Sequence, residues 1–245
     1  IVVWERPVKN PEFGAYYASI DPVSEGKTTT SDSLCSIFVY KNATEVTRTT
    51  AAGDVEQFIE KDKVVAAWCG RFDDINKTHE RLELIIEWYN AWTLVENNIS
   101  LFIQHMIARK KQRYLVPKQQ ILFLKDLGSN RTVYQEYGWK NTGTLFKSHL
   151  ISYAIEFLRE VIDEETDING VVTNQTLGVE RIPDPMLIKE MLAYYPGLNV
   201  DRLVAFGALI AFVKIQQSNR GYSKRRESED NSLVNSEKFT KLKYS

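Results

Sequence analysis

The amino-acid sequence predicts an α/β fold in which helices flank a mixed sheet. Short β-branched and aromatic runs come first, helix–strand–helix alternation follows, and apolar helices come last. This order places the strands in one sheet and lets the helices cover its faces. With 245 residues, of which 43% are hydrophobic, the chain can bury a substantial core as one large domain or two small ones.

Three strands are expected before the first helix. The runs AYYASID (15–21) and LCSIFVYKN (34–42) flank a Gly/Ser/Thr-rich connection and suit two sequential antiparallel strands. KVVAAWCG (63–70) supplies the third strand. The polar segment before this third strand is expected to hold a short strand around Val46 and a helical turn near Phe58.

Helices dominate the rest of the chain. Apolar residues at helical spacing predict a helix over 77–90, and a brief strand, WTLV, follows it and leads into Glu96. The later elements are expected at 100–112 (helix), 114–117 (strand), 144–165 (long amphipathic helix), 184–195 (short helix) and 199–215 (very apolar helix). From residue 218 the chain is polar and almost without apolar periodicity, which predicts a flexible tail.

Composition and charge restrict the class of protein. Because 31 Lys and Arg balance 32 Asp and Glu, a nucleic-acid partner needs a local basic patch rather than a global field. Cys35 and Cys69 lack zinc-site spacing and are typical of buried thiols in a reducing compartment. No apolar run approaches the ~18 residues of a membrane span, and no signal peptide opens the chain. We therefore expect a soluble intracellular protein without a membrane partner.

The triplet Gly26-Lys27-Thr28 matches the end of a phosphate-binding P-loop, but its surroundings do not. The first glycine of that motif is replaced by Asp21, and the following residues are polar and then strand-like instead of helical. A polar turn that joins two strands is the better interpretation. Lys27 would then be free to approach a phosphodiester.

Three carboxylates at the ends of predicted elements form the candidate site. Each has an ordinary alternative: a turn-forming acid before Pro22 for Asp21, a surface charge after a strand for Glu96, and an acid in the first helical turn for Asp201. Acids at the ends of neighbouring parallel strands, however, lie on the same edge of a sheet. A helix packed on that sheet can direct the third acid to the same point, and a buried acid needs a partner.

The three acids suit a hard divalent cation. Oxygen ligands without histidine or cysteine favour Mg²⁺ or Mn²⁺ over Zn²⁺. One or two such ions are expected, and two ions about 4 Å apart can activate water and stabilise the leaving oxygen in phosphodiester hydrolysis. Asp21, Glu96 and Asp201 are thus the predicted metal ligands and catalytic residues.

Several segments resemble a known family. These are YYASIDPVSEGKTTTSDSLCSIFVY, VVAAWCGRF, YNAWTLVENN and YPGLNVDRLVAFGALIAF. Together they resemble the C-terminal nuclease domain of the large terminase subunit of tailed bacteriophages, over residues 15–214. The resemblance implies an RNase H-like fold and a metal-dependent endonuclease that cuts concatemeric viral DNA during genome packaging. Its acidic cluster would be Asp21, Glu96 and Asp201.

Two positions depart from the family pattern. Ile99-Ser100-Leu101 follow the ENN element, where family members often carry a glycine, and Arg202 stands where some members have a second acid. These departures leave open whether one metal ion or two are bound.

The resemblance also implies a setting for the domain. Its partners would be double-stranded DNA, an N-terminal packaging ATPase domain of the same subunit that this sequence lacks, the portal and the small terminase subunit. The location would be the cytoplasm of the infected bacterium. Residues 1–14 would then be the remnant of an interdomain linker, 15–217 the nuclease domain and 218–245 a flexible tail.

A nuclease whose charges nearly cancel needs a local source of attraction for phosphate. The candidate DNA contacts are Lys27, the cluster Arg109, Lys110, Lys111 and Arg113, and Lys147 on the long helix. The ordinary alternative for each is a solvated surface charge. Low sequence specificity is expected, because contacts to phosphates carry no sequence information.

Two other functions stay open. One is another RNase H-like enzyme, such as a resolvase, an integrase-type recombinase or an RNase H. The other is a non-catalytic packaging or DNA-binding module that kept the fold without the activity.

Overall fold

The computed structural model describes residues 1–27, 33–49, 55–118, 136–140, 144–195 and 198–234. The chain forms two compact units, Ile1–Ala211 and Phe212–Ser245. Among the described residues, no helix is long and apolar enough to cross a membrane.

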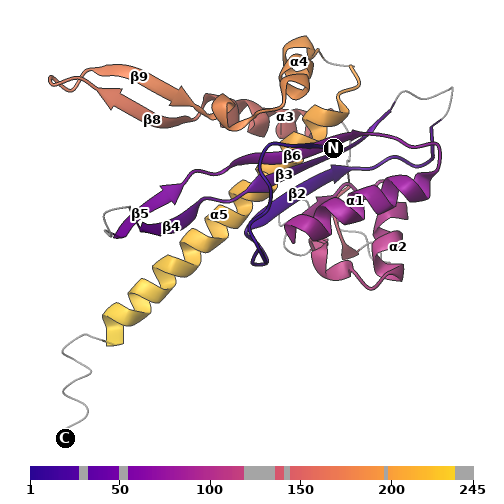
Figure 1. Cartoon of the computed structure of the whole chain (residues 1–245), viewed down its shortest axis with the longest axis horizontal. Coiled ribbons are helices and arrows are strands. Elements are labelled where there is room, and N and C mark those ends of the chain that lie inside the picture. Colours follow the sequence, from indigo (N-terminus) through magenta and orange to yellow (C-terminus); the bar gives the residue numbers. More distant parts are fainter. Residues whose placement is uncertain (28–32, 50–54, 119–135, 141–143, 196–197, 235–245) are drawn as a thin grey trace, which may run out of the picture. The chain divides into compact units, whose positions relative to one another are not determined.

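A five-stranded mixed sheet lies at the centre of the first unit, which confirms the predicted α/β fold (Figure 1). Its strand order is β1-β6-β3-β2-β7. The first four of these strands pair antiparallel, and β7 pairs parallel with β2. The bounds are Val2–Val3 for β1, Tyr16–Asp21 for β2, Cys35–Lys41 for β3, Lys63–Gly70 for β6 and Trp92–Val95 for β7.

The central strands are where the sequence predicted them because both of their faces are buried. Every residue of β3 is buried, as is every residue of β2 before Asp21. Strands covered on both sides are nearly continuous runs of apolar residues, and such runs are visible in a sequence. Pro22 follows β2 directly, and proline cannot donate a hydrogen bond to the ladder.

Helices α1 (Ile75–Tyr89) and α2 (Leu101–Ala108) lie on one side of the sheet (Figure 1). Helix α1 begins at Asp74, whose side chain accepts a hydrogen bond from the backbone of Asn76, and it ends at Asn90 in the left-handed conformation. Its buried residues join the inner residues of β2 and β3 in one core, which includes Tyr16, Ala18, Ile20, Ile37, Val39, Leu82, Ile86 and Tyr89.

Helices α3 (Thr144–Arg159) and α4 (Pro185–Ala193) lie on the other side (Figure 1). The first turns of α5 (Asp201–Val234) pack on the same face of the sheet. There the ring of Phe206 lies 5.9 Å from that of Phe38 and 5.7 Å from that of Phe157, between centroids. Asp184 caps α4 by accepting a hydrogen bond from the backbone of Met186. Because side chains alternate along β3, its aromatic residues face one side of the sheet and its aliphatic residues face the other.

The structure contains two hairpins that the sequence did not predict in full. Strand β4 (Thr44–Thr49) contains the predicted strand around Val46, but the helical turn near Phe58 is wrong. Phe58 lies in β5 (Val55–Glu60) and pairs with Val46. The apolar side chains of β5 that the structure describes, Val55, Phe58 and Ile59, are exposed, so burial gives this strand little apolar pattern in the sequence.

The long helix predicted over 144–165 ends at Arg159, and a hairpin of β8 (Val161–Thr166) and β9 (Val172–Leu177) follows. In the longer helix, the acidic residues 163–165 would have occupied the last turn, where the negative end of the helix dipole repels them. Asp167 closes the hairpin by accepting the backbone N–H groups of Asn169 and Val171, and Gly170 takes a φ of +79°.

Both ends of the chain contain secondary structure that the sequence did not indicate. Within residues 1–14, Val2 and Val3 form the edge strand β1, and the hydroxyl of Tyr89 donates to the carbonyl of Glu5. The helix expected to stop near 215 continues to Val234, although 218–245 was predicted to be a flexible tail. The boundary between the two units falls at Ala211. Residues 235–245 of the predicted tail lie outside the described residues.

The strand predicted over 114–117 is reduced to isolated bridges. Leu115 forms a parallel bridge with Thr93, and Pro117 an antiparallel one with Tyr137. A 3-10 turn, η1 (Gln112–Tyr114), leads into this segment, and a second one, η5 (Gly178–Arg181), follows β9.

Candidate functional site

Parallel pairing of β2 with β7 brings Asp21 and Glu96 to the same edge of the sheet. Ile20 is opposite Val95 in the register, and the backbone N–H of Glu96 donates to the carbonyl of Ile20 at 2.9 Å. Because side chains alternate along a strand, Asp21 and Glu96 also point to the same face. The sequence-based expectation for these two acids is therefore met in the geometry.

Asp201 reaches the same place from the first residue of α5. Its Oδ2 accepts a hydrogen bond from the backbone N–H of Leu34 at 2.8 Å and one from Nδ2 of Asn199 at 3.2 Å. Leu34 directly precedes β3, and Ser36 on that strand is opposite Asp21. The start of α5 is thus tied to the end of the sheet that carries the other two acids.

The pKa of Asp21 shows how close the three carboxylates are. Burial raises this pKa well above its ordinary value, and the negative charges of Glu96 and Asp201 raise it further. A hydrogen bond between the carboxyl groups of Asp21 and Glu96 acts in the same direction. Burial also raises the pKa of Asp201, and its hydrogen bonds from Leu34 and Asn199 offset only part of that rise. The site therefore holds more negative charge than its own groups balance.

Lys147 on α3 is the cation that faces this charge. Its ammonium group lowers the pKa values of both Asp21 and Asp201, although burial and the neighbouring acids outweigh it at Asp21. Its Nζ donates a hydrogen bond to the carbonyl of Leu198 at 3.4 Å, close to the start of α5. Lys147 is half-buried, and it is part of the acidic site rather than a solvated surface charge.

Two further polar side chains contact the acids or the helix that carries one of them. Nδ2 of Asn98 donates to Oε1 of Glu96 at 2.7 Å, which orients this carboxylate. Glu190 on α4 accepts the backbone N–H of Leu203 at 2.8 Å, and burial followed by the charge of Asp201 raises its pKa. The contact of α4 with the start of α5 arises from tertiary packing, so the sequence carried no local signal for Glu190.

The donor set fits a hard cation, but the acids are not arranged as ligands. Among the described residues, no three or more His, Cys, Asp and Glu side chains form a group that could hold a metal ion. The hydrogen bonds explain this, because Asp201 faces Leu34 and Asn199 while Asp21 and Glu96 bond to each other. Carboxylate oxygens with uncompensated charge are nonetheless the groups that Mg²⁺ and Mn²⁺ prefer.

The predicted basic cluster divides into two pairs. Arg109 and Lys111 form ion pairs with the buried carboxylate of Glu83, at 2.9 Å for Arg109, and so connect α1 to the end of α2. Lys110 is exposed, and the guanidinium of Arg113 lies 4.5 Å from the ring centre of Tyr114. Three of the four predicted DNA contacts thus have a partner inside the protein: Arg109 and Lys111 bind Glu83, and Arg113 contacts Tyr114.

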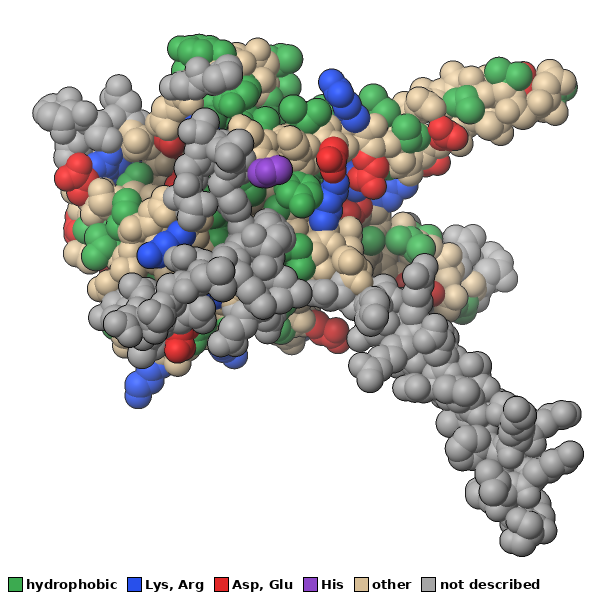
Figure 2. Space-filling view, turned by 180° about the vertical axis from the view of Figure 1, so that it is seen from behind, with side chains coloured by type: hydrophobic (Ala, Val, Ile, Leu, Met, Phe, Trp, Pro, Cys, Tyr) green, Lys and Arg blue, Asp and Glu red, His purple; other side chains and the backbone are tan. Residues whose placement is uncertain are grey.

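Lys27, the remaining predicted contact, is exposed on the turn after β2. Its backbone N–H donates to the carbonyl of Phe72 at 2.9 Å, which holds the start of this turn against the segment after β6. Residues 28–32, the rest of the polar turn, lie outside the described residues. On the face shown in Figure 2, the described Lys and Arg side chains are scattered among acidic ones instead of forming one patch.

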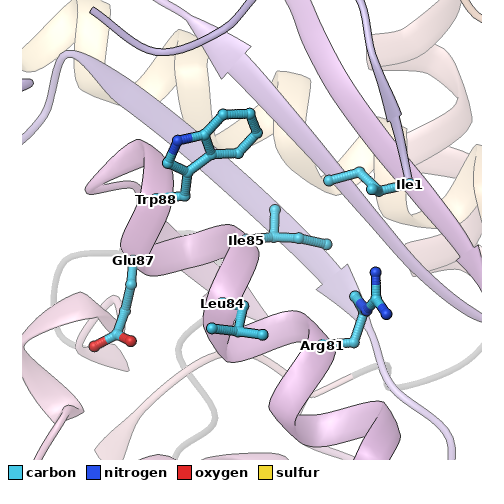
Figure 3. Close-up of a pocket in the computed structure, with 6 residues that line it drawn as sticks. All are labelled: Ile1, Arg81, Leu84, Ile85, Glu87 and Trp88. Atoms are coloured by element: carbon cyan, nitrogen blue, oxygen red, sulfur yellow. The ribbon is translucent and has the colours of Figure 1, made fainter. Parts of the chain in front are cut away.

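An apolar hollow of about 520 Å³ lies beside α1, away from the acidic site. Figure 3 shows Ile85 and Trp88 of α1 together with Ile1 around this hollow. It contains none of the predicted site residues. Its chemistry does not match that of the acidic cluster, and the two features are separate.

Comparisons of the chain with protein-family models, with curated proteins and with solved structures found no match. The fold and the side chains define an α/β protein with a partly buried acidic cluster at one edge of a mixed sheet.

Proposed function

We propose that this protein is a divalent-metal-dependent DNA endonuclease with an RNase H-like core, of the kind found in the large terminase subunit of tailed bacteriophages. The observation that carries the proposal is the convergence of Asp21, Glu96 and Asp201. These acids are far apart in the sequence, yet two of them raise the pKa of the third. Buried acids gathered in this way are typical of functional sites and costly elsewhere.

The topology supports the RNase H-like part of the proposal. Strands β2, β3 and β6 are sequential antiparallel neighbours apart from the inserted β4–β5 hairpin, and β7 follows α1 to pair parallel with β2. An RNase H-like sheet has antiparallel strands followed by parallel ones, with helices on both faces. Asp21 is the last residue of β2, and Glu96 directly follows β7, which pairs parallel with β2. These two acids therefore lie at the same edge of the sheet.

The residues of the chain have distinct roles in this proposal. Asp21, Glu96 and Asp201 would hold Mg²⁺ or Mn²⁺, and Asn98 keeps Glu96 oriented. A bound ion of this kind supplies a water of lowered pKa and stabilises the oxygen that leaves the phosphorus. Lys147 provides a positive charge at the site that a phosphate oxygen can contact. No described element resembles a base-reading helix in a groove, so cutting is expected to depend little on sequence.

The partners follow from the same proposal. Double-stranded DNA is the substrate, and the packaging ATPase domain, the portal and the small terminase subunit are the proteins with which such a nuclease works. A non-catalytic DNA-binding module is the second candidate. It is favoured by one observation, namely that the described acids are not arranged as a metal-binding group.

A substrate panel tests the proposal. Linear duplex DNA, a four-way DNA junction and an RNA–DNA hybrid are incubated with the chain in EDTA, Mg²⁺ or Mn²⁺. We expect metal-dependent cutting of the duplex without strong preference for the junction or the hybrid. A preference for the junction indicates a resolvase, and one for the hybrid an RNase H. Binding without cutting in either metal favours the non-catalytic module.

A further inference from the structure

We propose that a pocket beside the amino end of β7 holds an unpaired nucleobase together with its phosphate. This aromatic–cation pocket has a volume of about 390 Å³. Aromatic residues Phe13, Trp92 and Tyr137 line it together with Lys110 and Arg113. It shares no residue with the acidic site.

The aromatic rings provide a surface for stacking. Phe13 is 50% exposed, which is unusual for a phenylalanine, and its ring centre lies 5.8 Å from that of Trp92. Trp92 is held in place on its other side by the ring of Tyr17, at 6.4 Å. A rigid, partly exposed group of rings of this kind accepts a base of any identity, because every base has a flat apolar face.

The end of α2 places the cations of the basic cluster on different sides. Lys110 takes a φ of +58°, a conformation that favours glycine or asparagine. Its backbone N–H donates to the carbonyl of Ile107, and that of Lys111 donates to the carbonyl of Met106. This turn of the backbone at Lys110 divides the cluster. Arg109 and Lys111 bind Glu83, whereas Lys110 and Arg113 line the aromatic–cation pocket.

The combination of rings and cations selects the class of ligand. An inorganic phosphate would leave the rings unused, and an apolar ligand would leave the positive charges of Lys110 and Arg113 without an opposite charge in the pocket. A nucleotide is both planar and anionic, and a cavity of this size lies within the range of small-molecule sites, about 300–1,000 Å³. Single-stranded DNA and a free nucleotide share this chemistry.

The position of the pocket suits a strand of DNA. Trp92 and Glu96 lie four residues apart along β7 and so on the same face of the sheet, which places them about 13 Å apart. A short stretch of unpaired strand can span that separation. If the acidic site cuts DNA as proposed, the pocket would hold an unpaired nucleotide near the cut. The binding itself does not depend on cutting.

Binding of a labelled dT12 oligonucleotide in EDTA, followed by fluorescence anisotropy, tests this inference. We expect Phe13→Ala and the double variant Lys110→Gln/Arg113→Gln each to weaken binding about 5- to 50-fold. The matched controls are Trp88→Ala, which removes an aromatic ring that is 45% exposed on α1, and Lys77→Gln/Lys189→Gln, which removes two exposed lysines. These controls are expected to change the affinity less than about twofold.

The competitor dTMP separates the two sources of the ligand. If dTMP displaces dT12 at similar concentrations, a free nucleotide is the natural ligand. If dT12 binds far more tightly, a DNA strand is the natural ligand. Equal loss in the Phe13→Ala and Trp88→Ala variants would overturn the inference, as would absence of binding to both dT12 and dTMP. Because no metal or cutting is involved, these outcomes leave the nuclease proposal unaffected.

Discussion

The negative charge of Asp21 is unfavourable in the folded protein. Its carboxyl group is desolvated, and the two nearest charges of its own sign are Glu96 and Asp201. Lys147 provides partial compensation. A charged group in this position lowers stability, and such a cost is common at functional sites.

We expect Asp21→Asn to stabilise the protein in EDTA near pH 7.5. The pKa of Asp21 is raised above its ordinary 3.8, so the folded state binds this proton more tightly than the unfolded state. Stability is therefore lost as pH rises from about 4 through the folded-state pKa, and an uncharged amide avoids that loss. The melting temperature should rise by about 2–4 °C for each kcal/mol gained.

Thermal unfolding followed by circular dichroism between pH 4 and pH 8 checks this expectation. Asp73→Asn, at an exposed acid outside the site, serves as the control and should follow the parent protein. The advantage of the Asp21→Asn variant should grow as pH rises. A variant that melts below the parent at pH 7.5 would show that the charge of Asp21 is already well compensated.

At the scale of elements, a close approach of α3 and α5 covers the face of the sheet that carries the acids. Gly207 lies where the two helices touch, and a Cβ there would meet the carbonyl oxygen of Leu150 at 2.5 Å. Only a residue without a side chain allows this distance. The contact helps to fix the start of α5, and therefore Asp201, against the rest of the first unit.

Gly207→Ala is expected to destabilise the protein by about 1–3 kcal/mol, because the helices must move apart. Helix propensity alone predicts the opposite effect, an increase in the free energy of unfolding of up to about 1 kcal/mol. Urea unfolding measures the difference. His149→Ala, at an exposed position of α3, is the comparison and should change stability by no more than about 0.5 kcal/mol. A Gly207→Ala protein as stable as the parent would show that the two helices are not packed this closely.

Elements buried on both faces could be predicted from the sequence, and exposed ones could not. The runs that became β2, β3 and β6 are mostly apolar, so their bounds were nearly correct. The hairpins β4–β5 and β8–β9 bury little apolar surface, and their patterns therefore misled: Phe58 was placed in a helical turn, and the segment after Arg159 in a helix. In both cases strand pairing, which involves the backbone, prevailed over side-chain periodicity.

At the scale of the whole molecule, the acidic site could be predicted in part. The positions of Asp21 and Glu96 follow from strand order alone, since parallel neighbours end at one edge. Lys147 was predicted as a DNA contact, but its position beside Asp201 could not be predicted, nor could Glu190, because both depend on how α3 and α4 pack. The division of the basic cluster depends likewise on the buried carboxylate of Glu83, which lies on a different helix.

Cleavage of supercoiled plasmid tests the central claim most directly. The chain, its Asp21→Asn, Glu96→Gln and Asp201→Asn variants, and the control Glu80→Gln at an exposed acid of α1 are compared in EDTA, Mg²⁺ and Mn²⁺ at matched folding. We predict cutting that requires metal, falls at least about 100-fold in each of the three site variants and is unchanged in the control. Metal-dependent cutting that persists in the Asp21→Asn and Asp201→Asn variants would contradict the assignment of the acidic site.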